Sequence, residues 1–516
     1  MAIRKPRGTQ DFLPEQMINW HYIEQRMREI CKVYGFNEIR TPAFEYTNLF
    51  LRGIGETTDV VQKEMYTFKT GDDGGSSFAL RPENTASAVR AYLENKVYGK
   101  EGLTKWYYMG PMFRHDKPQA GRYRQFHQFG AEVLGSQSPV VDSEVICMVV
   151  QLLKDFGLKD LNVEVNSVGC PTCRPVYREK LIEFFEPKKE QLCSDCQERL
   201  YKNPLRILDC KNETCKSLSV GAPEIHEHLC EECHDHFEEL KTYLTAANVQ
   251  YTLNPRLVRG LDYYTKTAFE VQYTPLGAQS AVAGGGRYDG LVEELDGPHT
   301  PAIGFAMGME RLLLALEKQN LLPEQTVEPV IFVVSLGDAA KAEAFKLCQK
   351  LRSLNVPVEM DGQGKSMKAQ LKYANKIKAK YVIIIGDDEL SNNSQIIRYM
   401  SASKQELVKV EGILEHINEI YTVLKHSNLY TSKEYNLDEV LYGYYSNPDS
   451  SELSSNSNVL KLIHRLFEKL YSKHVELNNL TDNVSIHKSS EFENYKEFVA
   501  DLISYIAGYK IKNRKG

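Results

Sequence analysis

Residues 105–134 read as two strands joined by a loop that is unusually rich in cations. The flanks KWYYMGPMF and FHQFGAEVL are apolar and aromatic at strand length, and DKPQAGRY between them carries Pro and Gly as turn residues. The segment therefore predicts a long antiparallel hairpin. A basic cluster beside aromatic residues is typical of a surface that faces phosphate or nucleic acid, and the alternative is a solvated, salt-bridged hairpin. The cations in and beside the loop are Arg114, His115, Lys117, Arg122, Arg124 and His127.

Length, charge and hydropathy restrict the class of protein. A chain of 516 residues is too long for one ordinary domain. Its net charge of −6 argues against a surface that coats nucleic acid throughout, although it leaves room for local basic patches. The apolar runs at 330–334 and 381–385 have strand length and are too short to span a bilayer. The basic N-terminus lacks the apolar core of a secretory signal, so we expect a cytosolic protein without a membrane partner. In that compartment the 11 cysteines are expected to be thiols or metal ligands rather than disulfides.

The composition changes several times along the chain. Strand and helix signals alternate up to residue 169, and strand-like, Gly-rich sequence returns at 256–290. The segment between them, 170–253, contains eight of the cysteines among charged helical stretches, so we interpret it as an insertion within one larger domain. Strands that alternate with helices over 330–424 predict parallel βαβ units in a small α/β domain. The last segment, 425–516, combines a Ser/Asn-rich linker with two amphipathic stretches, which predicts an additional helical tail.

The eight cysteines of the insertion fall into four close pairs. Short spacing lets one loop supply two of the four ligands of a tetrahedral ion, so the pairs predict structural zinc. The alternative is eight free thiols, and the cysteines alone would also fit a zinc-dependent nucleic-acid-binding module. The sequence leaves open which pairs would share an ion. The pairs are Cys170 and Cys173, Cys193 and Cys196, Cys210 and Cys215, and Cys230 and Cys233.

Four further stretches combine unusual residues. LRPENT at 80–85 precedes a predicted helix and, taken alone, is a capping arrangement. LVRGLDYYTKTAFE at 257–270 holds an Arg, an Asp and two Tyr beside a strand-like end. The three consecutive glycines of AVAGGGRYDGL at 281–291 allow either a sharp turn or a close approach of the main chain to a ligand. AIGFAMGMERLLL at 302–314 places Arg311 in an apolar helix, where it is either part of a core ion pair or a phosphate contact.

The order of these stretches, with TPAFEYTNLF before them and the cationic hairpin among them, closely resembles the histidyl-tRNA synthetase family of class II aminoacyl-tRNA synthetases over residues 1–424. The resemblance implies an α+β protein. Its antiparallel-sheet catalytic domain would span 1–325 and contain the Cys-rich insertion at 170–253, and an α/β anticodon-binding domain would follow at 330–424. The tail at 425–516 lies outside the resemblance. The implied activity is that of an ATP- and Mg²⁺-dependent ligase, which joins L-histidine to the 3′ end of tRNA(His) by way of histidyl-adenylate. TPAFEYTNLF matches a region at the dimer interface of the family, so a homodimer is also implied.

The resemblance assigns roles to individual residues. Arg114 and Arg259 are implied as the catalytic residues on two sides of the α-phosphate of ATP, where permanently charged, bidentate donors suit an anionic target. Phe126 is expected to stack on adenine, and the loop from Lys117 to Arg124 to meet the acceptor stem of the tRNA. A carboxylate opposite an imidazole N–H would reject analogues that leave buried groups unpaired. The implied ATP-binding residues are Arg114, Arg122, Phe126 and Arg311, and the implied histidine-binding residues are Glu83, Thr85, Gln128, Glu132, Arg259, Tyr263, Tyr264 and Tyr288.

A second function within the same fold is a catalytically silent paralogue that regulates histidine biosynthesis. Such a binding protein is expected to lose the catalytic signature residues and the anticodon-binding domain. Arg114, Arg259, Arg311 and the segment 330–424 are all present in this chain, which favours the enzyme.

Overall fold

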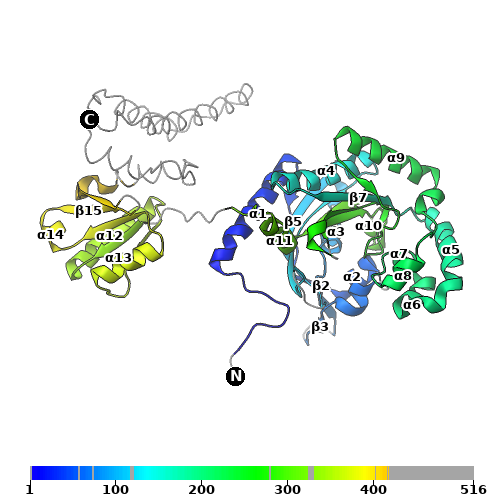
Figure 1. Cartoon of the computed structure of the whole chain (residues 1–516), viewed down its shortest axis with the longest axis horizontal. Helices are drawn as coiled ribbons and strands as arrows, with labels where there is room; N and C mark the ends of the chain where they lie inside the picture. Colours follow the sequence, from blue (N-terminus) through cyan, green and yellow to red (C-terminus); the bar gives the residue numbers. More distant parts are fainter. Residues whose placement is uncertain are drawn as a thin grey trace. The chain divides into compact units, whose positions relative to one another are not determined.

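The computed structural model of the protein describes residues 3–55, 58–71, 75–100, 102–116, 121–277, 280–323, 331–400, 403–414 and 417. The chain divides into two compact units, Met1–Pro323 and Glu324–Gly516 (Figure 1). The helical tail predicted at 425–516 and the loop residue Lys117 lie outside the described residues. A membrane-spanning helix is absent from the described part of the chain, where no helix is both long and apolar enough.

An eight-stranded sheet forms the centre of the first unit (Figure 1). Its six central strands are antiparallel, as the sequence predicts, whereas the short strand at each edge pairs in parallel with its neighbour. The sheet is therefore mixed. In spatial order the strands are β1 (Asn37–Glu38), β5 (Thr104–Phe113), β6 (Gln125–Leu134), β11 (Ala302–Gly308), β10 (Ala281–Arg287), β9 (Thr265–Tyr273), β7 (Leu161–Ser167) and β8 (Thr252–Leu253).

The predicted hairpin is confirmed as β5 and β6, which pair over their whole length. Successive side chains of a strand point to opposite faces of the sheet. Phe129, Ala131 and Val133 of β6 are buried in the main hydrophobic core, so Gln128 and Glu132 must face the other side. The alternation in FHQFGAEVL thus separates one face that stabilises the fold from another that is lined with polar groups.

Helices cover the two faces of this sheet. The main core contains residues of α1 (Pro14–Val33), α4 (Pro139–Asp155), α9 (Glu231–Ala246) and α11 (Met309–Lys318). A second cluster joins α3 (Thr85–Glu94) and α10 (Leu291–Glu294) to a group of buried tyrosines. The helix that the sequence predicts around Arg311 begins only at Met309, because residues 302–308 continue as β11 between two partner strands.

A small three-stranded sheet precedes the hairpin, and a helical insertion follows β7. The small sheet has the order β2 (Phe44–Tyr46), β4 (Ser77–Leu80) and β3 (Thr67–Lys69), with α2 (Thr47–Ile54) after β2. Between β7 and β8 lie α5 (Cys173–Phe185), α6 (Ser194–Lys202), α7 (Leu205–Leu208), α8 (Glu213–Leu218) and α9. Helices α5 to α8 enclose their own small core, which contains Cys196, Cys210 and Cys215.

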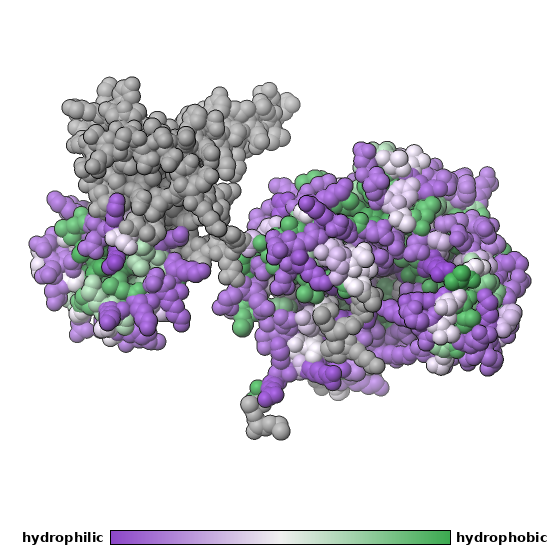
Figure 2. Space-filling model, in the orientation of Figure 1, coloured by the Kyte–Doolittle hydropathy of each residue, from purple (hydrophilic) through white to green (hydrophobic). Residues whose placement is uncertain are grey.

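In the second unit, the residues that the structure describes form a five-stranded sheet with helices on both faces. Ile331 and Val333 of β12 belong to one buried cluster, and Phe332 and Val334 belong to another. Strands β12, β13 and β14 are parallel, as the sequence predicts, whereas two further antiparallel strands at one edge are not anticipated. In both units, the residues that Figure 2 colours by hydropathy present a mainly hydrophilic surface in this view. The elements are β12 (Ile331–Ser335), α12 (Asp338–Ser353), β13 (Val358–Met360), α13 (Met367–Lys376), β14 (Tyr381–Ile385), α14 (Asp387–Ser391), β15 (Ser394–Tyr399) and β16 (Lys404–Lys409).

Candidate active site

Two cavities meet at the polar face of the eight-stranded sheet. The larger has a volume of about 220 Å³ and the smaller about 150 Å³. Both are lined by residues from β6, β10 and β11, and both include Arg114, Gln128, Arg259, Gly284 and Ala306. Because these residues belong to both walls, groups bound in the two cavities would meet at the two arginines.

The larger cavity is lined by cations and an aromatic ring. All of the residues expected to bind ATP lie here, namely Arg114, Arg122, Phe126 and Arg311. The guanidinium of Arg114 lies 5.4 Å from the centre of the Phe126 ring, and its Nε donates to the main-chain oxygen of Pro82 at 2.9 Å. Burial lowers the pKa of Arg114 and of Arg311. Charges withdrawn from water in this way act more strongly on a bound anion.

The smaller cavity combines two polar groups from the start of α3 with three tyrosines. Glu83, Thr85, Tyr263, Tyr264 and Tyr288 all line it. The rings of Tyr263 and Tyr264 are 4.7 Å apart, and that of Tyr288 lies 5.6 Å from Tyr263. With Gln128 and Arg259, seven of the eight residues expected to bind histidine therefore line one cavity.

Glu83 both caps a helix and lines this cavity. Its carboxylate accepts hydrogen bonds from the main-chain N–H groups of Thr85, at 2.7 Å, and Ala86, at 3.0 Å. These are the first N–H groups of α3, which have no acceptor within the helix. Burial raises the pKa of Glu83, against the effect of these hydrogen bonds. The capping interpretation of LRPENT thus holds, and the same carboxylate remains available to the cavity.

Glu132 is the exception among the expected histidine ligands, because it lies behind the cavity wall. It is fully buried, and its carboxylate accepts hydrogen bonds from Thr85 Oγ1 (2.7 Å), Tyr108 Oη (3.0 Å) and Tyr288 Oη (2.6 Å). A side chain at Gly304 would collide with it. Burial raises the pKa of Glu132 to about 7, although the three hydroxyl groups oppose the shift. The direct contact with imidazole stays a prediction.

Arg259 is held across the strand that carries the three glycines. Its Nη1 donates to Glu270 Oε2 at 2.7 Å. A Cβ atom at position 284 would lie 2.6 Å from the guanidinium nitrogens, so a larger residue there would displace the Arg259 side chain. Arg259 Nε and Gln128 Oε1 are buried without a hydrogen-bond partner among the described residues. Buried polar atoms are rarely left unpaired, so both are fitted to contact a ligand.

The cationic loop is partly neutralised by its neighbours. Arg122 Nε lies 2.6 Å from Asp116 Oδ2, and His127 Nδ1 lies 2.9 Å from Glu310 Oε1. The salt-bridged interpretation therefore describes Arg122, and His127 is hydrogen-bonded to Glu310. The arginine of LRPENT, Arg81, is also structural, because it donates to main-chain oxygens of Pro111 and Thr41.

Three carboxylates of the larger cavity are not anticipated from the sequence. Asp116, Glu270 and Glu310 line it together with the arginines. Glu270 ends the stretch that contains Arg259, and Glu310 precedes Arg311. The presence of an acid and an arginine in the same stretch was the signal that could have identified them.

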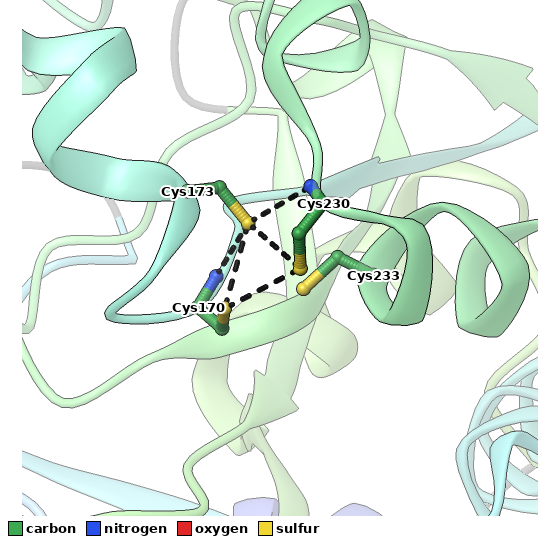
Figure 3. A group of neighbouring side chains, drawn as sticks. All are labelled: Cys170, Cys173, Cys230 and Cys233. Carbon is green, nitrogen blue, oxygen red and sulfur yellow. Dashed lines mark hydrogen bonds between the residues drawn. The ribbon is translucent and has the colours of Figure 1, made fainter.

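The eight cysteines form two separate groups of four, and the structure thereby assigns the pairs. In the first group, Cys170, Cys173, Cys230 and Cys233 point their sulfurs toward one another (Figure 3). The second group consists of Cys193, Cys196, Cys210 and Cys215. Within each group the sulfur atoms lie within 4.8 Å of one another. The shorter separations are 3.5 Å for Cys170 and Cys173 and 3.8 Å for Cys193 and Cys210.

These distances fit the chemistry of zinc. Four sulfurs at about 2.3 Å from a tetrahedral ion are about 3.8 Å apart. Burial opposes ionisation of Cys170, but hydrogen bonds from Cys173 and Thr172 outweigh it and lower the pKa of the Cys170 thiol to about 6. The thiolate is the form that binds a metal ion. Burial raises the pKa of the other thiols for which a shift is resolved, except Cys193, so the fit to zinc rests on the positions of the four sulfurs in each group.

The sheet with its six antiparallel central strands, the hairpin with its arginine and the two adjoining cavities define a class II aminoacyl-tRNA synthetase fold. The family described as histidyl-tRNA synthetase matches residues 8–312, and an anticodon binding domain matches residues 330–420. A histidine–tRNA ligase of Pelotomaculum thermopropionicum is 52% identical over 428 residues, which cover 83% of this chain and 100% of the relative. One from Desulfitobacterium hafniense is 55% identical over 405 residues, or 78% of this chain and 95% of the relative.

A solved structure gives the same result. The crystal structure of apo S. aureus histidyl-tRNA synthetase is 42% identical with a TM-score of 0.69, and the match covers 81% of this chain and 100% of that one. This chain belongs to the histidyl-tRNA synthetase family, which confirms the resemblance read from the sequence.

Proposed function

We propose that the protein activates L-histidine with ATP and transfers the histidyl group to the 3′ end of tRNA(His). One observation carries this proposal. A cation-lined cavity and a tyrosine-lined cavity share a wall that contains Arg114, Gln128 and Arg259. A reaction between an anionic nucleotide and an amino acid requires such a shared wall, because the carboxylate of one must reach the phosphate of the other.

In the activation step, a carboxylate oxygen of histidine attacks the α-phosphorus of ATP. An acyl-phosphate bond forms, and the bond to the β-phosphate breaks, so pyrophosphate leaves with the electron pair. Arg114 and Arg259 would neutralise the charge that gathers on the α-phosphate. Little covalent chemistry falls to the protein in such transfers, where positioning and charge stabilisation supply most of the rate.

The ammonium group of histidine would be bound by acceptors on the smaller cavity. The carboxylate of Glu83 and the unpaired Oε1 of Gln128 both line it, and Thr85 stands beside them. The imidazole ring would lie against Tyr263, Tyr264 and Tyr288. Glu132 is held by hydrogen bonds from three hydroxyl groups. It would orient the imidazole ring either by direct contact or through Tyr288, which donates a hydrogen bond to it.

The ATP would lie in the larger cavity, with adenine on Phe126 and with Arg122 and Arg311 near the phosphates. Magnesium prefers oxygen ligands, and the carboxylates of Glu270 and Glu310 give the cavity suitable donors. When bound, Mg²⁺ neutralises the β- and γ-phosphates and so assists the departure of pyrophosphate.

Further proposals concern the rest of the chain. The catalytic domain would span 1–325 with its insertion at 170–253, and 330–424 would bind the anticodon, which the match at 330–420 supports. A ligase for tRNA would act in the cytosol. The tail at 425–516 receives no role.

A homodimer is also proposed, through the small sheet β2–β4–β3. Phe44, Tyr46 and Phe68 are large apolar residues with exposed fractions of 51%, 61% and 39%, and the rings of Phe44 and Phe68 lie 6.1 Å apart. A second copy would cover this aromatic surface. Sedimentation analysis tests the proposal, since a monomer at micromolar concentration would contradict it.

We also propose that each group of four cysteines binds one structural zinc ion. The sulfur separations and the low exposure of both groups support this. Metal analysis of the purified protein should find about two zinc ions per chain, since each tetrahedral site takes four ligands. A folded insertion without metal would contradict the proposal.

Histidine-dependent exchange between ATP and pyrophosphate tests the function. The intact protein should catalyse this exchange with histidine, and other amino acids should not support it. The rival function, a silent paralogue that regulates histidine biosynthesis, predicts binding without exchange. Well-folded protein that binds histidine but shows no exchange would therefore replace the proposed enzyme with that paralogue.

A further inference from the structure

The segment that carries Arg259 is held from outside the sheet by the insertion. Arg256 donates to the main-chain oxygen of Ser219 at 3.3 Å. Arg206 Nη1 donates to the main-chain oxygen of Arg259 at 2.8 Å, and Asn203 Nδ2 donates to Asp262 Oδ1 at 3.1 Å. Residues 256–262 thus run across a surface made by α6, α7 and α8.

The contact from Arg206 is the one that reaches the catalytic residue itself. The Arg206 side chain is only 15% exposed and lies 3.8 Å from Asp59 Oδ2. The same carboxylate oxygen accepts from Arg199 at 2.8 Å. Arg206 Nη1 also lies 3.5 Å from where a Cβ of Gly260 would be. The guanidinium is therefore confined between an acid on one side and the main chain of residues 259–260 on the other.

The second cysteine group determines where Arg206 lies. Arg206 is on α7, a helix of four residues, between Cys196 and Cys210 of that group. The main-chain N–H of Cys210 donates to the oxygen of Ile207 at 3.1 Å, and Ile207 is buried in the same small core as both cysteines. A helix of one turn has no stability of its own, so the four sulfurs and this core hold α7 in place.

We propose that Arg206 is a positioning residue for Arg259, and that a metal ion in the group Cys193, Cys196, Cys210 and Cys215 fixes its position. This inference rests on the proposed roles of Arg259 and of zinc. It makes occupancy of a site in the insertion a determinant of the rate of histidine activation, because displacing a catalytic group by about 1 Å can cost about a hundredfold in rate.

The test uses full-length protein and the exchange reaction. Arg206→Met keeps most of the side-chain volume but removes the donor, and Arg206→Lys restores a cationic donor. The matched control is Arg178→Met, because Arg178 also donates to a main-chain oxygen, that of Tyr201, but wholly within the insertion. Zinc content and the thermal melt are measured for each variant. If the methionine variant loses its cooperative melt, Arg206→Gln takes its place.

We expect Arg206→Met to lower kcat by about tenfold to a hundredfold, with unchanged zinc content and nearly unchanged KM for histidine and ATP. Arg206→Lys should recover most of the rate, and Arg178→Met should resemble the wild type. A kcat within about twofold of wild type, an equal loss in the Arg178 variant, or a loss confined to KM would overturn the proposal. Wild-type protein without exchange would instead contradict the function.

A double variant separates positioning from general damage. Cys210→Ser should release about one zinc ion per chain and lower kcat. In the Arg206→Met background the same substitution should add little, because residues that act through one contact give non-additive losses. Losses that multiply would show that the metal and Arg206 act independently, and would overturn the link between them.

Discussion

The eight-stranded sheet and the cysteine-rich insertion both position groups of one active site, and they do so by different means. In the sheet, ten consecutive residue pairs of β5 and β6 are in register, so the place of Gln128 follows from its position along the strand. In the insertion, α7 has four residues and α8 has six, which is too short for a helix to be stable alone. A hydrogen-bond ladder fixes the positions of side chains in the first region, and in the second region we propose that sulfur ligands of a metal ion do so.

The largest expected effect is a loss of activity on substitution of Arg259, which contacts both regions. Arg259 is bonded to Glu270 of the sheet and to Arg206 of the insertion. Arg259→Ala should reduce histidine-dependent exchange by about 10²–10³-fold, the usual result of losing one preorganised charge. Calorimetry should show that histidine still binds. A variant that keeps its rate would remove Arg259 from the reaction and leave it as a structural link.

The second expected effect is a change of stability with pH, and it arises from Glu132 in the sheet. Burial raises the pKa of Glu132 to about 7, whereas the unfolded chain retains the usual value near 4.5. As pH rises between these values the unfolded state loses its proton first, so the free energy of unfolding falls, by on the order of 3 kcal/mol. Below about 4.5 both states are protonated and the effect vanishes.

Glu132→Gln provides the comparison that isolates this group. The difference in free energy of unfolding between wild type and variant should change across that pH range in urea titrations. Glu83, whose pKa is also raised by burial, is present in both proteins, and its charge is one cause of the raised pKa of Glu132, so the difference reports Glu132 together with this coupling. A constant difference from pH 4.5 to 7 would show that Glu132 is ionised in the folded protein.

The smallest expected effect follows from removing the proposed metal ion, which should disturb the insertion and leave the sheet intact. A chelator that removes the metal should lower exchange activity by about tenfold, since Arg259 keeps its bond to Glu270 but loses the contact from the insertion. Hydrogen exchange should show lost protection in α6 to α8 and retained protection in β5 and β6. Equal loss in both regions would mean that the sheet also depends on the metal.

The same difference explains what the sequence could predict. The alternation of apolar and polar residues predicted the hairpin and the two faces of β6, because successive side chains of a strand point to opposite faces of the sheet. Nothing comparable links Cys193 to Cys215 or Cys170 to Cys230, so the pairing of cysteines required the three-dimensional structure. The edge strands β15 and β16 were missed because they follow a run of parallel units without a distinct signal.

Within the candidate site, the sequence predicted which residues gather there more easily than how far each side chain lies from the cavities. The expected ligands were placed around two cavities, yet Glu132 proved to lie behind one of them. A strand places Glu132 on the same face as Gln128, but its distance from the cavity depends on Tyr108, Tyr288 and Gly304, which come from three other segments. The carboxylates of Asp116 and Glu270 were overlooked although their partners, Arg122 and Arg259, are near in the sequence. Only Glu310 has a remote partner, His127.

The first cysteine group has a consequence for the topology of the chain. Cys173 and Cys230 are 57 residues apart in sequence, and their sulfurs lie 3.5 Å apart. Closing a flexible loop of this length costs about 4 kcal/mol of chain entropy, and the proposed metal ion at its base would offset that cost. The chain would then leave the catalytic domain and return to it at the same place, with the insertion as a closed loop between. Its interior can lengthen, shorten or diverge while the strands on either side keep their register.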